Sequence, residues 1–148
     1  MIYEFKKGKY LISSDKRKLQ IKTIHNFLTN AYWSKGIMIE RVRKAIEGSL
    51  CFGVYHEKEQ VGFVRVVTDY ANFGYIADVF IIENYRGKGL SVWLLKCILN
   101  LPELKDIKSW MLATKDAHGL YSKFGFEQLK KPQKFMQKIN PKCFSIVR

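Results

Sequence analysis

Apolar residues in the first third of the chain recur at strand and helix spacings. Residues 1–12 alternate between apolar and polar side chains, which predicts a first strand at Ile2–Lys6 or at Tyr10–Ile12. The residues Ser13, Ser14 and Asp15 follow, and such residues are typical of a helix N-cap. Apolar positions near the 3.6-residue period then predict a helix to about Asn30; they are Leu19, Ile21, Ile24, Phe27 and Leu28. A second helix is predicted at Ile39–Glu47, ending near a glycine.

Strands dominate the middle of the chain. The segments Leu50–Tyr55 and Val61–Val67 flank a polar turn and predict a hairpin. The next strand, Tyr75–Ile82, is apolar on both faces, which places it centrally in its sheet. A polar loop with two glycines leads into an apolar helix at Leu90–Leu99. After it we expect a short strand at Trp110–Ala113, a short helix at Asp116–Lys123, and two weak strands in the remainder.

The predicted order of elements is therefore βααβββαβαββ. This order describes an α/β protein with a mixed sheet (α+β), without an internal repeat or a linker. The length of 148 residues fits one domain, 1–148, with room for an apolar core.

Charge is the unusual bulk property of the sequence. The chain carries 26 Lys and Arg against 13 Asp and Glu, a net charge of +13, which favours an anionic partner such as phosphate groups, RNA or an acidic protein. No dense basic run is present, so a solvated basic surface explains the charge equally well. No apolar run is long enough to cross a bilayer and the first residues lack a signal-peptide pattern, so we expect a cytoplasmic protein without a membrane partner. The three cysteines and three histidines show neither disulfide nor metal-ligand spacing.

The loop Asn84–Ser91 carries the first sign of chemistry. It leaves a central strand and enters a helix, and its glycines let a ligand approach the main chain closely. Free amides at a helix start bind anions, and Arg86 and Lys88 add positive charge there. The P-loop pattern is absent, and the GxGxxG dinucleotide pattern fails at its third glycine. A diphosphate site and a simple glycine turn both remain open on these residues alone.

Two motifs together resemble the GNAT superfamily of acyl-CoA-dependent N-acyltransferases. Arg86-Gly87-Lys88-Gly89-Leu90-Ser91 is similar to its Arg/Gln-x-x-Gly-x-Gly/Ala signature for the coenzyme A pyrophosphate, with Ser91 in place of the last small residue. Farther along, Ala117-x-x-Leu120-Tyr121-x-x-Phe124-Gly125-Phe126 resembles the Ala-x-x-Leu-Tyr-x-x-x-Gly-Phe pattern. The resemblance covers the C-terminal two thirds of the chain. It implies the GNAT fold with a splayed central pair of strands, acetyl-CoA as acyl donor, no metal, and transfer of acetyl to a primary amine.

The resemblance also implies roles for single residues. Tyr121 corresponds to the general acid that protonates the departing thiolate. Thr114 stands where many relatives carry an asparagine that contacts the coenzyme, and a hydroxyl can replace only part of that contact. The remaining coenzyme contacts are expected from strand and loop residues, largely through the main chain: Val79, Phe80, Ile81, Arg86, Gly87, Lys88, Gly89, Leu90 and Ser91.

The general base and the acceptor are less determined. Asp78 is the only ionisable residue in an apolar strand, where burial would raise its basicity, yet a buried aspartate is as often an acceptor for structural hydrogen bonds. Glu83 or water are the alternatives for the base. Tyr32 and Trp33, with Arg65, are the expected acceptor-binding residues. The acceptor would be an amine of a small molecule or of a protein.

Two other functions fit parts of the sequence. The basic, aromatic composition would suit a nucleic-acid-binding module, although no recognition motif is present. A GNAT domain that binds acyl-CoA without turnover is the second, and Tyr121 with the intact glycine loop argues against it. An acidic partner and either a monomer or a homodimer are compatible with the sequence.

Overall fold

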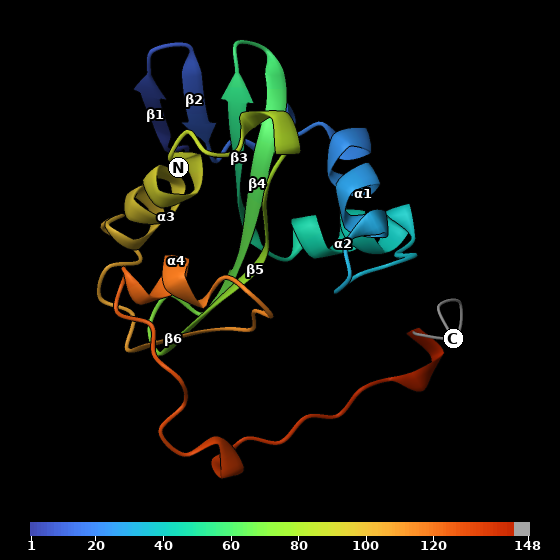
Figure 1. Cartoon of the computed structure of the whole chain (residues 1–148), viewed down its shortest axis with the longest axis vertical. Coiled ribbons are helices and arrows are strands. Elements are labelled where there is room, and N and C mark those ends of the chain that lie inside the picture. Colours follow the sequence, from blue (N-terminus) through green and yellow to red (C-terminus); the bar gives the residue numbers. More distant parts are fainter. Residues whose placement is uncertain (144–148) are drawn as a thin grey trace.

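A single mixed sheet organises the chain in the computed structural model, which describes residues 1–143 (Figure 1). Six strands follow one another in chain order across it, so each strand pairs with its neighbours in sequence. They are β1 (Glu4–Lys7), β2 (Tyr10–Ser13), β3 (Leu50–His56), β4 (Glu59–Thr68), β5 (Phe73–Ile81) and β6 (Ser109–Leu112). All pairs are antiparallel except β5 and β6, which run parallel because α3 connects them as a crossover.

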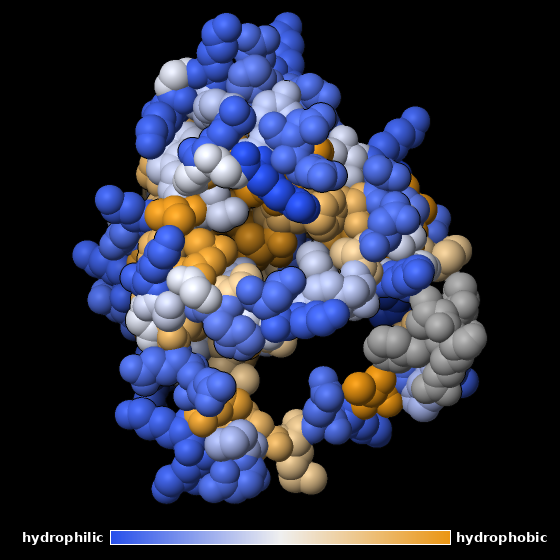
Figure 2. Space-filling model, viewed as in Figure 1, coloured by the Kyte–Doolittle hydropathy of each residue, from blue (hydrophilic) through white to orange (hydrophobic). Residues whose placement is uncertain are grey.

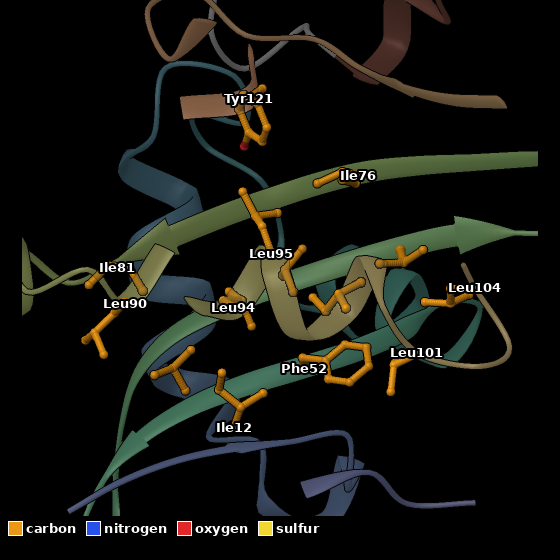
Figure 3. Packing of buried hydrophobic residues seen from close by; sticks show 14 of the residues in the cluster. Ile12, Phe52, Ile76, Ile81, Leu90, Leu94, Leu95, Leu101, Leu104 and Tyr121 are labelled. Atoms are coloured by element: carbon orange, nitrogen blue, oxygen red, sulfur yellow. The ribbon is translucent and has the colours of Figure 1, made fainter. Parts of the chain in front are cut away.

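Helices cover both faces of this sheet, and the alternation of side chains along the strands supplies a core on each side. On one face, α3 (Leu90–Leu99) packs Leu94, Leu95 and Ile98 against Phe52 and its neighbours (Figure 3). On the other face lie α1 (Ile21–Asn30) and α2 (Ile39–Glu47). Their apolar stripes pack against the adjacent strand residues; this second core consists of Ile24, Leu28, Val42, Ile46, Cys51, Phe63 and Phe80. The short helix α4 (His118–Ser122) follows β6.

The N-terminus forms more strands than the sequence predicted. The sequence offered one strand in either of two places, whereas both places form strands, β1 and β2, joined by a hairpin at Gly8. The expected N-cap also acts elsewhere. Asp15 accepts a hydrogen bond from the Arg17 amide and caps the 3₁₀ turn Lys16–Lys18, while α1 starts after Gln20 without a side-chain cap.

The C-terminal part of the described chain forms fewer strands than the sequence predicted. The two weak strands expected there are absent from residues 127–143, which run as an extended segment with 3₁₀ turns at Pro132–Lys134 and at residues 141–143. The residues of this segment are exposed rather than packed on the body, so no neighbouring strand pairs with them. The observed order is therefore ββααβββαβα within residues 1–143.

The sheet opens between β5 and β6, as the expected splayed pair requires. The two strands pair only from Phe73 with Ser109 to Ile76 with Leu112, and the second half of β5 has β4 alone as a partner. A bulge at the same level disrupts the ladder between β4 and β5. Asp78 lies in this bulge with φ of 57°, a left-handed conformation that aspartate tolerates better than most residues. The opening leaves main-chain groups of β5 free to bind a ligand.

Tyr55 is a destabilising feature of the core and gives a testable prediction. Its hydroxyl is buried and has no hydrogen-bond partner among the described residues, and burial strongly raises the pKa of the phenol. We expect Tyr55→Phe to raise the free energy of unfolding by about 1 kcal/mol and the Tm by about 3 °C, because an unsatisfied polar group is removed at constant shape.

Urea unfolding at pH 7.5 and pH 10.5 measures this effect. Since the folded state holds the Tyr55 proton more tightly than the unfolded state, the wild type loses stability above the unfolded pKa of about 10. The advantage of the variant should therefore grow at pH 10.5. A variant that is less stable at both pH values would contradict the assignment.

Candidate active site

A cavity of about 660 Å³ lies beside the opening of the sheet. Three parts of the chain form its walls: the α1–α2 loop with one face of α2, the bulged half of β5, and the loop from β6 into α4. All three acceptor-binding candidates, Tyr32, Trp33 and Arg65, lie on its wall, together with Asp78, Val79, Thr114 and Tyr121. The fold thus gathers in one cavity residues that are widely separated in sequence.

Asp78 is the centre of a polar network in this cavity. Its Oδ2 accepts a hydrogen bond from Nε of Arg65 at 2.9 Å, and its Oδ1 accepts one from Nε1 of Trp33 at 2.9 Å. Arg65 also donates to Oγ of Ser49 at 3.0 Å. The side chains of Arg65 and Asp78 are only 20% and 14% exposed, so water screens their ion pair weakly. The network joins the bulge of β5 to β4 and to the α1–α2 loop.

The network predicts a stability effect for Asp78→Asn. Asparagine tolerates the left-handed backbone and can still accept from Trp33, but it leaves the Arg65 charge without its counter-ion. We expect the free energy of unfolding to fall by about 2 kcal/mol in urea titrations. Trp33→Phe is the matched control, since it removes one hydrogen bond to the same carboxylate and should cost about 0.5 kcal/mol. If the two variants lowered the free energy of unfolding equally, the ion pair would add no stability beyond that of one hydrogen bond.

The main chain of β5 presents alternate residues to the opening. The Ile82 amide donates to the Val61 carbonyl, and Phe80 pairs with Phe63, so the main-chain groups of Phe80 point toward β4. Those of Ile81 point the opposite way, as do those of Val79, toward the gap before β6. The prediction that the Phe80 amide contacts the coenzyme is therefore wrong, because a strand presents only every second amide to one side. The Phe80 ring stacks on Phe27 at a centroid distance of 4.0 Å and belongs to the core.

The glycine loop has the geometry of an anion site. Gly87 and Gly89 have φ of 78° and 77°, which only glycine adopts readily, and a Cβ built on either would meet no atom within 4 Å. Gly89 is the N-cap of α3, and no side chain caps the first amides of the helix. Leu90 lies in the core and can contribute only its main chain, Ser91 is half-buried, and Lys88 is exposed.

Arg86 has a different contact from the one expected. Its Nε donates to the carbonyl of Ile81 at 2.9 Å, on the side of β5 that faces the gap. The side chain thereby closes the turn between β5 and α3 and leaves its terminal nitrogens as donors. Arg86 thus links the anion site at α3 with the free edge of β5.

Tyr121 stands at the other wall of the opening. It is 8% exposed, its ring meets Phe126 edge-on, and its hydroxyl is directed toward β5 (Figure 3). Among residues 1–143 the hydroxyl has no hydrogen-bond partner, and it lines the cavity. Burial, followed by the nearby Tyr32, raises the pKa of Tyr121 to about 12. The group is therefore a neutral proton donor at ordinary pH.

Thr114 and Tyr32 have structural contacts that the sequence did not suggest. Oγ1 of Thr114 accepts from the amide of Ala117, the residue just before α4, at 3.0 Å. Oη of Tyr32 accepts from the Lys115 amide at 3.1 Å and ties the α1–α2 loop to the loop before α4. Five further polar residues of the cavity wall are not among the predicted site residues, because they come from separate parts of the chain: Ser34, Arg41, Tyr75, Asp116 and Gln137.

No group of three or more His, Cys, Asp or Glu side chains able to hold a metal is found within residues 1–143. In the same residues, no helix has the length and apolar character needed to cross a membrane.

Comparisons with known proteins agree with this geometry. The sequence pattern of the acetyltransferase (GNAT) domain matches residues 47–128, which include β3 to α4 and both sequence motifs. A protein of Gibberella zeae with the provisional name of an acetyltransferase is 32% identical, over 79% of this chain and 78% of its own length.

Solved structures extend the likeness to the whole fold. The crystal structure of a protein from Xanthomonas campestris, assigned to the GNAT family, has a TM-score of 0.87 at 39% identity and covers 92% of this chain and 96% of that one. The part of this chain that the Xanthomonas structure does not cover is shorter than the segment 127–148. Part of that segment therefore has a counterpart in the Xanthomonas protein. A Clostridium acetobutylicum protein crystallised with acetyl-CoA shares the fold alone, with a TM-score of 0.58 at 13% identity and coverage of 95% and 96%. The chain therefore belongs to the GNAT family of acetyltransferases.

Proposed function

We propose that this acetyltransferase moves the acetyl group of acetyl-CoA to a primary amine. The observation that carries the proposal is the arrangement around the opening of the sheet. An anion site at the start of α3, the free edge of β5 and the Tyr121 hydroxyl follow one another along one path. A molecule with a diphosphate, an amide-containing arm and a thioester at its end fits this order of groups.

Each part of the path has a defined task in this proposal. The amides at Gly87 to Ser91, with Arg86 and Lys88, would hold the diphosphate. Main-chain groups of Val79 and Ile81 would hold the pantetheine arm as an added strand. These contacts place the thioester carbonyl near the bulge of β5, in reach of an amine in the large cavity, which is the positioning that a direct transfer needs.

The proton balance of the transfer involves Tyr121. A carbon–nitrogen bond forms and the carbon–sulfur bond breaks, so the amine loses a proton and the departing sulfur gains one. Tyr121 would give its proton to the sulfur and regain one from solvent. Both oxygens of Asp78 already accept hydrogen bonds, from Arg65 and Trp33, which favours a positioning role for Asp78. Water is then the acceptor of the amine proton.

The acceptor would lie between the α1–α2 loop and β5. Tyr32 and Trp33 offer aromatic faces at 57% and 41% exposure, which suit the apolar or cationic part of an amine. The high positive charge of the chain would favour an acceptor or partner with acidic groups. The amine would belong to a small molecule or to a protein. A cytoplasmic location is a prediction from the sequence.

Ligand-dependent thermal stability tests the proposal directly. We expect a saturable rise in Tm with acetyl-CoA, a smaller or equal rise with CoA, and none with ATP or NAD at the same concentration. A panel of primary amines would then be tested for release of CoA thiol. Equal rises in Tm with acetyl-CoA, ATP and NAD would indicate a general phosphate-binding site. No rise in Tm with millimolar acetyl-CoA would refute acetyl-CoA as the acyl donor.

A further inference from the structure

The wall of the large cavity carries charged side chains that do not all neutralise one another. Of the four charged residues on this wall, Arg65 and Asp78 form an ion pair with each other. The other two are Arg41 on α2 and Asp116 in the loop before α4. Within the described part of the chain, neither makes a hydrogen bond or an ion pair. The cavity therefore has one unpaired cation and one unpaired anion, on two different walls.

Arg41 lies on the face of α2 that borders the cavity. Val42, Ala45 and Ile46 border it as well, because positions one, four and five residues apart lie on one side of a helix. Arg43 is exposed on the same helix but is not part of the cavity wall. The winding of α2 thus brings one of its two arginines, and not the other, to the candidate active site.

The wall near Arg41 is largely apolar. The region that Figure 1 shows between α2, β5 and α4 contains apolar residues bordered by hydrophilic ones in Figure 2. Leu28 and Ile37 extend the apolar wall from α1 and from the α1–α2 loop. A ligand group that pairs with Arg41 would therefore be attached to a carbon body that contacts these side chains.

A carboxylate is the group that best matches Arg41. The planar guanidinium can donate two parallel hydrogen bonds to the two oxygens of a carboxylate. One unpaired cation also balances the single negative charge of a carboxylate, whereas a phosphate monoester carries more than one negative charge at pH 7. The charge on this wall therefore favours a carboxylate over a phosphate.

The two unpaired charges also orient such a ligand. In the proposed transfer the amine meets the thioester beside the bulge of β5 and Tyr121. Asp116 belongs to the loop that leads into the helix of Tyr121, so it attracts an incoming ammonium group toward that wall. Arg41 belongs to α2, on another wall, and would hold the end of the ligand that does not react.

We propose that the acceptor is a small amino carboxylate with an apolar or aromatic body, and that Arg41 binds its carboxylate. The acceptor class rests on the proposed acetyl transfer and goes beyond it, because that transfer alone would accept any primary amine. The cavity of about 660 Å³ has the size of a small-molecule site. Arg41 is then the residue that selects acids among amines.

Pairs of amines that differ in one carboxylate test this selection. The pairs are phenylalanine with phenethylamine, leucine with isopentylamine, and δ-aminovalerate with pentylamine, and release of CoA thiol gives kcat/KM for each member. We expect the acid to exceed its partner by at least about tenfold in the pair that fits the cavity best, through the charge-assisted hydrogen bonds to Arg41. Equal or higher kcat/KM for the amine without a carboxylate in every pair would overturn the proposal.

Arg41→Gln is expected to reduce the preference for the acid to about twofold or less, because glutamine keeps a hydrogen-bond donor but has no charge. Arg43→Gln is the matched control, since it removes the same charge from an exposed position of the same helix. It should leave the preference within about twofold of the wild type. An equal loss of preference in both variants would show that net charge, rather than contact with Arg41, selects the acid.

Two further measurements separate the possible outcomes. If phosphoethanolamine exceeds ethanolamine by more than any acid exceeds its partner, the site selects phosphate and the carboxylate is refuted. The rise in Tm with acetyl-CoA tests the proposed function independently of the acceptor. If that rise occurs but no member of any pair is acetylated, the acceptor class is wrong while the coenzyme site stands.

Discussion

Replacing Gly89 with aspartate is expected to raise the dissociation constant for acetyl-CoA by at least about a hundredfold, equivalent to about 3 kcal/mol of binding free energy. Gly89 lies at the start of α3 with φ of 77° and open space where a Cβ would project. A carboxylate there would occupy the position of the phosphates and repel them. The same carboxylate is favourable at the N-terminus of a helix, so the fold should persist despite a strain of about 1 kcal/mol.

Gly89→Asn separates charge from shape in this experiment. Asparagine has the size of aspartate and tolerates a positive φ, but it is neutral. We expect the dissociation constant of the Gly89→Asn variant for acetyl-CoA, measured by calorimetry, to rise about tenfold or less relative to the wild type. If the two variants bind acetyl-CoA with equal affinity, the loop does not hold the phosphates. If neither variant binds less tightly than the wild type, the coenzyme lies elsewhere.

Tyr121→Phe is expected to lower kcat by about a hundredfold and to leave the KM for acetyl-CoA within about threefold. The variant removes only the hydroxyl, which has no hydrogen-bond partner within the described residues, so no hydrogen bond is lost with it. Release of CoA thiol, with an amine identified in the panel, measures the effect. Tyr32→Phe is the control, because it removes a hydroxyl on the facing wall that holds the Lys115 amide. Turnover within twofold of the wild type would exclude Tyr121 as the proton donor.

The pH dependence of the wild type gives a second check on Tyr121. Burial raises the pKa of its phenol to about 12, so the donor stays protonated across the range in which the enzyme can be assayed. Activity should rise with pH as the amine loses its proton and should then stay level to about pH 10. A fall in kcat between pH 8 and pH 10 would indicate a donor of lower pKa.

Periodic apolar residues and local motifs were enough to predict much of this fold. The helical spacing of Ile24 and Leu28 and the doubly apolar strand ending at Ile81 reflect burial that each element requires wherever it packs. The glycines at positions 87 and 89 indicate a left-handed turn through their own backbone preferences. Such features depend on neighbours in sequence, so they can be predicted without the tertiary structure.

The end of the chain shows where local pattern fails. The sequence predicted two weak strands after α4, but the described chain offers residues 127–143 no partner strand. A strand exists only where a second strand supplies its hydrogen bonds. Which segment supplies that partner is not encoded in the local pattern itself.

The sequence by itself determined the family, and it predicted the glycine turn before α3 and the place of Tyr121 in the motif beyond that turn. Only the tertiary structure decided that Asp78 binds Arg65 and Trp33 and that Ile81, rather than Phe80, presents its main chain to the gap. It also decided that residues 127–143 do not pair with the outer edge of β6 within the described chain. The physical reason is that strand register and long-range contacts arise from packing between segments distant in sequence, whereas caps, turns and periodicity arise within a few residues.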